Sequence, residues 1–200
     1  GSDFTPLIAA SIGPYGAMLH DGAEYRGDYG VSADLLRDFH ASRLRLFDAC
    51  DVDVIALETI PSLLEAQVLA ELLGECDRPS WVSFSCKDER TISDGTPVER
   101  AARIFSGHPN VVAVGLNCTP PQYAPDLVGR FRDAAPDKAV IVYPNSGETW
   151  HPEDGSWSGT VTPLDYANAA RKWVSAGARI IGGCCRTGPA HIRAMRAATR

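Results

Sequence analysis

The chain has 200 residues, a formal net charge of −6, 44% hydrophobic residues and 22% charged residues. This length suits one domain with a sizeable core, and the composition is that of a globular protein rather than a disordered one. The negative charge disfavours nucleic acid or an anionic membrane as a partner, and no apolar run is as long as a membrane span.

Six cysteines are scattered along the chain, at positions 50, 76, 86, 118, 184 and 185. This is not a dense disulfide framework, so we expect reduced thiols and a cytoplasmic location. A bridge between the adjacent Cys184 and Cys185 would close a strained small ring and is disfavoured.

Short apolar strands alternate with amphipathic helices along the sequence. The predicted strands cover residues 7–11, 53–59, 81–85, 111–116, 139–143 and 179–181. The predicted helices begin near residues 32, 62, 96, 119, 162 and 189, and long loops are expected over 13–30 and 145–161. Each strand is thus followed by a helix, six times in succession.

Several of these helices start with recognisable capping residues. Ser62 and Glu65, and likewise Thr96 and Glu99, have the spacing of a capping box, in which two side chains satisfy free backbone N–H groups. Pro125 is expected to interrupt the helix of residues 119–135.

Near-continuous apolar strands alternating with helices predict an α/β fold with a parallel sheet covered by helices. The candidates are a doubly wound sheet and a (β/α)8 TIM barrel. A barrel uses about 250 residues for eight units, so 200 residues hold about 6.5 units. This count matches the six predicted βα units and indicates a barrel with two units missing.

Reactive and polar side chains stand where the predicted strands end. They are Ser11, Glu58, Cys86, Cys118, Asn145, Cys184 and Cys185. In parallel α/β folds the loops at the carboxyl ends of the strands converge on one face, where ligands bind. We therefore expect these side chains to share one site.

Cys118, Cys184 and Cys185 resemble a catalytic zinc site with three protein ligands and one open position. Consecutive strand residues face opposite ways, so the adjacent cysteines can bind one metal only where the strand breaks. Gly182 and Gly183 give the backbone that freedom. Two alternatives stay open: His151 as a fourth ligand of a structural zinc, and three cysteines that are merely buried.

The other candidates each have two interpretations. Glu58 could anchor a ligand ammonium or pair with an arginine, and Asn145 could be a site residue or a turn residue. Lys87 could form a Schiff base or be a solvated loop charge, and Cys86 is expected to line the core. Thr187 and Gly188, at a helix start, could hold phosphate.

Five segments together resemble the homocysteine S-methyltransferase family, which consists of zinc-dependent (β/α)8 barrels. The segments are SIGPYGA, ALETIPSLLEA around Glu58, GLNCT around Cys118, YPNSGE around Asn145, and GGCCRT around Cys184 and Cys185. They occur in the family's order and look closest to the branch that uses S-methylmethionine or S-adenosylmethionine as methyl donor.

The resemblance implies zinc held by Cys118, Cys184 and Cys185, with the sulfur of homocysteine at the open position. It also implies that a methyl group passes from the sulfonium donor to this sulfur, giving methionine. Glu58, Asn117 and Asn145 are the implied substrate-binding residues, with Asn145 filling the open position when substrate is absent. The implied partners are small molecules.

The resemblance further implies that residues 1–200 are one homocysteine-binding barrel domain, truncated at the N-terminus. Family members carry about two more strand–helix units upstream, which implies that the six units here are strands 3–8 of an incomplete barrel. A barrel of eight strands cannot close with six. Two other functions remain as alternatives: a barrel lyase or aldolase that uses Lys87, and a non-catalytic domain stabilised by zinc.

Overall fold

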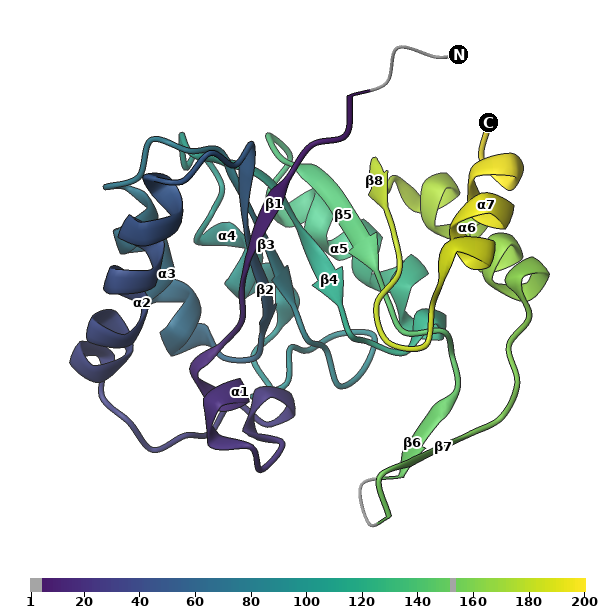
Figure 1. Cartoon of the computed structure of the whole chain (residues 1–200), viewed down its shortest axis with the longest axis horizontal. Helices are drawn as coiled ribbons and strands as arrows, with labels where there is room; N and C mark the ends of the chain where they lie inside the picture. Colours follow the sequence, from purple (N-terminus) through teal and green to yellow (C-terminus); the bar gives the residue numbers. More distant parts are fainter. Residues whose placement is uncertain (1–4, 152–153) are drawn as a thin grey trace.

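Six parallel strands form one curved sheet in the computed structural model, which describes residues 5–151 and 154–200 (Figure 1). The strands are β1 (Ala9–Ile12), β2 (Val54–Ile60), β3 (Ser80–Phe84), β4 (Val111–Asn117), β5 (Ala139–Tyr143) and β8 (Ile180–Ile181). They lie in the order β1-β2-β3-β4-β5-β8, so each strand pairs with the next strand of this sheet along the chain. The six predicted strand–helix units are all present.

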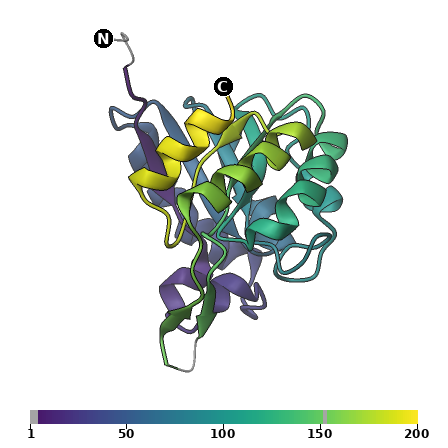
Figure 2. The same ribbon diagram turned by 90° about the vertical axis from the view of Figure 1, so that its right-hand side faces the viewer.

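Helices flank the convex side of this sheet (Figures 1 and 2). They are α2 (Ala33–Asp48), α3 (Leu63–Leu73), α4 (Val98–Arg103), α5 (Ala124–Ala134), α6 (Pro163–Ala176) and α7 (Pro189–Ala198). Their apolar faces and the sheet enclose the core, where Phe84 of β3 stacks on Phe131 of α5 with ring centroids 5.9 Å apart. Both rings are fully buried, so this layer ties the helices to the sheet.

The predicted capping box of α3 forms only in part. Ser62 accepts a hydrogen bond from the backbone N–H of Glu65, but the Glu65 carboxylate does not return to Ser62. It is completely buried and instead accepts bonds from the Tyr15 backbone N–H (2.6 Å) and the Tyr29 hydroxyl (2.9 Å), and contacts His40 Nε2 at 2.8 Å. A buried carboxylate needs several hydrogen-bond partners, so Glu65 makes these tertiary contacts instead of the return bond of a capping box.

Two other local predictions are wrong. Helix α4 begins with Pro97 at its N-cap and no side-chain cap from Thr96. Pro125 lies in the first turn of α5, where its missing N–H costs nothing, and therefore does not interrupt the helix.

Both long predicted loops contain regular structure. The first holds α1 (Tyr15–Leu19) and the short 3-10 helix η1 (Ala23–Tyr25), and a second 3-10 helix, η2 (Pro121–Tyr123), precedes α5. The second loop holds an antiparallel hairpin of β6 (Thr149–His151) and β7 (Ser156–Ser158). Trp150 and Trp157 are paired across it, a contact that stabilises a short hairpin.

The carboxyl ends of the strands meet at one rim of the sheet, the lower edge in Figure 1, where α1 and the hairpin project. Among the described residues, no helix is both long and apolar enough to cross a lipid bilayer.

Candidate metal centre

Breaks in two strands bring the three cysteines to the rim. Cys118 follows the last residue of β4 and has a left-handed backbone, with φ 46°. Strand β8 ends at Ile181, directly before Gly182 and Gly183, so the predicted break lies where expected. The loop of residues 182–188, called the cysteine loop below, follows this break. Within it, the N–H of Cys184 donates to the carbonyl of Pro144 at 2.9 Å, which holds the loop against the end of β5.

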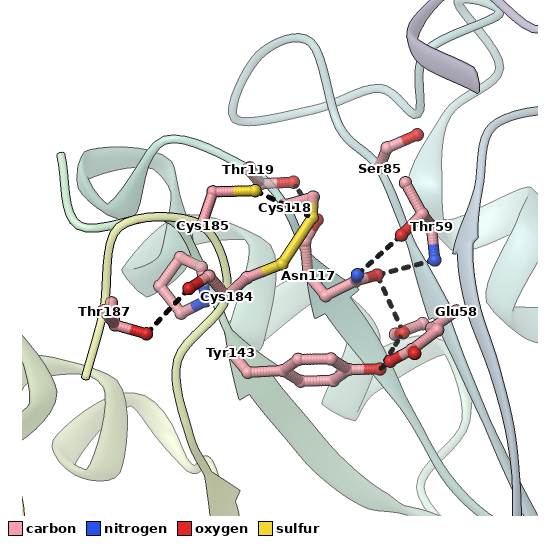
Figure 3. Close-up of a disulfide and its surroundings, with 12 residues drawn as sticks. Glu58, Thr59, Ser85, Asn117, Cys118, Thr119, Tyr143, Cys184, Cys185 and Thr187 are labelled. Atoms are coloured by element: carbon pink, nitrogen blue, oxygen red, sulfur yellow. Dashed lines mark hydrogen bonds between the residues drawn. A yellow bond between two sulfur atoms is a disulfide. The ribbon is translucent and has the colours of Figure 1, made fainter. Parts of the chain in front are cut away.

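The three cysteine sulfurs lie within 4.8 Å of one another (Figure 3). Those of Cys118 and Cys185 are 3.9 Å apart, and Cys118 and Cys184 are joined by a disulfide. The structure thus differs from the expectation of reduced thiols, and the bonded partner of Cys184 is Cys118 rather than its neighbour. The Cα atoms of the bonded pair are 5.6 Å apart, within the usual range for a disulfide, whereas adjacent cysteines would close a strained ring.

In the reduced form, this set of donors fits a soft divalent metal. Zinc–sulfur bonds of about 2.3 Å place two sulfurs of a tetrahedral site about 3.8 Å apart. The separation of 3.9 Å between Cys118 and Cys185 agrees with that value. Of the described residues, only these three cysteines form such a cluster, and His151 lies outside it.

Asn145 adds a polar atom to the same region. Its backbone N–H donates to the carbonyl of Thr119 at 3.1 Å, and its side chain lines the cavity that Cys118 also lines. The Oδ1 atom is buried and has no hydrogen-bond partner among the described residues. A buried acceptor without a partner is costly, so a ligand at the site would satisfy it.

Glu58, at the end of β2, is held by hydroxyl groups rather than by the arginine that one interpretation expected. The Tyr143 hydroxyl donates to Oε2 at 2.9 Å and the Ser11 hydroxyl donates to Oε1. Burial raises the pKa of Tyr143, and the nearby charge of Glu58 raises this pKa further. Tyr143 therefore stays protonated and donates its hydroxyl hydrogen to Glu58.

Asn117 braces the end of β2 from β4 (Figure 3). It is almost fully buried, and its Oδ1 accepts from the Thr59 N–H at 2.7 Å and from the Ser83 hydroxyl at 2.8 Å. Its Nδ2 donates to Thr59 Oγ1 at 2.7 Å. Thr59 has φ 65°, a strained value for a β-branched residue, so Asn117 compensates backbone strain directly beside Glu58.

A cavity of about 860 Å³ opens beside the cysteines. Its wall contains side chains that the sequence did not single out, and these come from η1, η2 and the hairpin: Glu24, Tyr25, Tyr123, Trp150 and Trp157. The two tryptophans, in a segment rich in glycine and serine, were the one signal that could have indicated a binding loop.

A sequence model of the homocysteine S-methyltransferase family matches residues 2–199. The chain belongs to the homocysteine S-methyltransferase family. Homocysteine S-methyltransferase YbgG of Bacillus subtilis is 47% identical over 98% of this chain, and selenocysteine Se-methyltransferase of Brassica oleracea var. italica is 43% identical over 94%. The chain covers 62% and 56% of those two proteins.

The solved structures of this family include the homocysteine methyltransferase MmuM of Escherichia coli, in a metallated and an oxidised form. The metallated form is similar with a TM-score of 0.81 and 40% identity, over 96% of this chain and 61% of MmuM. The predicted α/β fold of the barrel type is thereby confirmed, with six consecutive βα units. This chain spans about three-fifths of the length of YbgG and of MmuM.

Within this family fold, the remaining candidates have other roles. Cys86 is buried and burial raises its pKa strongly, so it is a neutral core thiol. The Thr187 hydroxyl donates to the Cys184 carbonyl at 2.7 Å and braces the cysteine loop. Lys87 lines the cavity but is exposed beside Asp88, unlike the desolvated lysine that a Schiff base requires.

Proposed function

We propose that the chain carries the zinc and homocysteine site of an enzyme that transfers a methyl group from a sulfonium donor to the homocysteine thiol, giving methionine. The donor is S-methylmethionine or S-adenosylmethionine. The observation that carries this proposal is the convergence of three cysteine sulfurs within 4.8 Å at the rim of the sheet. Residues 1–200 would act as one homocysteine-binding barrel domain. A reducing cytoplasm suits it, because the thiol ligands must be reduced.

Cys118, Cys184 and Cys185 would hold the zinc ion as thiolates. Bound zinc lowers the pKa of a thiol that coordinates it, so that homocysteine is present as a thiolate at neutral pH. Asn145, whose buried Oδ1 lacks a partner, is the residue we assign to the open side of the site when homocysteine is absent.

Glu58 would bind the homocysteine ammonium. Its two oxygens are already oriented by Ser11 and Tyr143, so little conformational freedom is lost when the ligand arrives. Asn117 is a positioning residue, because it holds the strained backbone of Thr59 next to this carboxylate.

The transfer is an in-line displacement at the methyl carbon. The acceptor thiolate forms a new sulfur–carbon bond while the carbon–sulfur bond of the donor breaks, and its electron pair passes to the donor sulfur. A thiolate and a sulfonium thus become two neutral thioethers. Because charge disappears in this step, a site that excludes water favours it, provided that the two sulfurs are held in line.

A methyl-transfer assay on the full-length, reduced and zinc-loaded protein tests the proposal. S-methylmethionine and S-adenosylmethionine are offered separately with homocysteine, and selenocysteine serves as a second acceptor because one relative carries its name. We expect methionine from at least one donor. No methylation of homocysteine by either sulfonium would contradict the proposal.

Replacing Glu58 with glutamine is expected to raise the KM for homocysteine about 10- to 100-fold, because a charged hydrogen bond contributes about 1.5–3 kcal/mol. Zinc content should not change, since the three cysteines remain. Glu75→Gln, which alters an exposed carboxylate after α3, is the matched control and should leave KM unchanged. An unaltered KM in Glu58→Gln would exclude Glu58 as the ammonium ligand.

A further inference from the structure

The hairpin of β6 and β7 presents two aromatic rings to the cavity beside the cysteines. Trp150 and Trp157 have ring centroids 5.2 Å apart and both line this cavity together with Cys118. Trp150 is 46% exposed, so its ring is not part of the core. The hairpin projects from the rim of the sheet (Figures 1 and 2), where a short two-stranded element gains little stability by itself.

Glu24 contributes a negative charge to the wall of the same cavity, from η1. Its Oε2 is buried and has no hydrogen-bond partner among the described residues. Asp21 lines the cavity too, but Arg26 pairs with it at 3.1 Å. An unpaired buried carboxylate oxygen is costly unless a cation accompanies it. Glu24 is therefore the carboxylate here that lacks a positive partner.

Lys87 and His20 are the basic side chains that line the cavity, and neither makes a hydrogen bond to this oxygen. The Lys87 side chain is the one with a permanent charge. It is exposed, so solvent and salt screen this charge. A cationic ligand in the cavity would supply the positive partner that Glu24 lacks among the described residues.

We infer that this cavity is the methyl-donor site, and that Glu24 with Trp150 and Trp157 recognises the positive charge of the sulfonium. This inference rests on the proposed function. A sulfonium has no N–H group to donate, so a protein can recognise it only by charge and by the faces of aromatic rings. A carboxylate and a pair of indole rings on the wall of one cavity meet both requirements.

The size and position of the cavity agree with this role. Its volume of about 860 Å³ lies within the range of small-ligand sites. Cys118 lies in its wall, so the cavity borders the centre that would hold the acceptor sulfur. After transfer the donor product is a neutral thioether, which loses the attraction to Glu24 and to the rings and can leave.

Titration calorimetry on the full-length protein, with S-methylmethionine as ligand, tests the inference. We expect Glu24→Gln and Trp150→Leu each to raise the Kd for S-methylmethionine about 5- to 30-fold, as expected for the loss of a partly desolvated cation contact. Methionine lacks one S-methyl group, so its sulfur is a neutral thioether instead of a sulfonium. It should bind the wild type at least about 10-fold more weakly than S-methylmethionine does. Asp28→Asn, which alters an exposed carboxylate near Glu24 that is paired with Arg26, is the matched control and should leave Kd unchanged.

Steady-state kinetics separate the possible outcomes. If both variants keep the wild-type Kd and KM for the donor while methyl transfer continues, the inference is wrong and the proposed function stands. The inference would also be wrong if the two substitutions raised only the KM for homocysteine. It would be wrong as well if they raised the Kd for methionine by the same factor as the Kd for S-methylmethionine. Saturable binding of S-methylmethionine that Glu24→Gln weakens, without any methyl transfer, would support the cation site and overturn the proposed function.

Discussion

Replacing Cys118 with serine is expected to lower bound zinc from about one ion per chain to near zero, and to reduce methyl transfer at least about 100-fold. The reason is that serine stays protonated and is a poor ligand for a soft metal, so the sulfur set at the rim loses one of its three members. Without the metal the acceptor stays a thiol, and several kcal/mol of charge stabilisation are lost. Metal analysis of protein purified under reducing conditions, with a transfer assay, measures both effects.

The matched control for this prediction is Cys50→Ser, because Cys50 is a free, half-buried cysteine outside the cluster. It should keep full zinc and activity. Removing zinc from the wild type with a chelator should abolish transfer but leave the fold intact, since the core between sheet and helices contains none of the three cysteines. Unfolding on chelation would instead indicate a structural zinc domain, and full zinc in Cys118→Ser would refute the assignment of this ligand.

Replacing Gly115 with alanine is expected to destabilise the protein by about 3 kcal/mol or more, at the upper end for overpacking in a core. Gly115 lies in β4, and a Cβ atom there would be 1.8 Å from the backbone carbonyl oxygen of Ile141 in β5. The obstacle is backbone, so the two strands must separate. Since Cys118 follows three residues later, zinc affinity should fall as well. Urea denaturation gives the change in the free energy of unfolding.

Gly129→Ala provides the control for this variant. Gly129 lies in α5, and an added Cβ would meet nothing within 4 Å. Alanine should therefore stabilise the helix by about 0.5–1 kcal/mol, because glycine is the poorer helix former. Equal effects of the two substitutions would show that the close approach of β4 and β5 is not the cause.

The periodic elements were predictable because their signals are local. Strands β2 and β5 match the expected ranges within one residue, and α7 begins at Pro189 as expected, since apolar runs and helix-start residues act over a few positions. The hairpin around Trp150 was missed because its strands have three residues each, too few for a period to be recognised.

Competition between local and distant partners explains the other errors. Glu65 has the spacing of a capping residue, but its carboxylate is buried and contacts His40, Tyr29 and the backbone N–H of Tyr15 instead. The interpretation that Glu58 pairs with an arginine is wrong, because the hydroxyl groups of Ser11 and Tyr143 donate to it, whereas its role as an ammonium anchor stays a prediction. Partners 25 to 85 residues away along the chain cannot be deduced from local spacing.

The sequence by itself determined the order of the six βα units. It also determined that Glu58, Asn145 and the three cysteines follow strand ends. Because apolar strands alternate with helices, all carboxyl ends of the strands lie at one rim. Only the tertiary structure decided which of these side chains meet. It placed Cys118 beside Cys184 and Cys185 across 66 residues of chain, and Trp150 and Glu24 on the wall of one cavity. Such distances depend on register, on strained backbone such as that of Thr59, and on backbone contacts such as that of Gly115, all of which arise only when the strands pack.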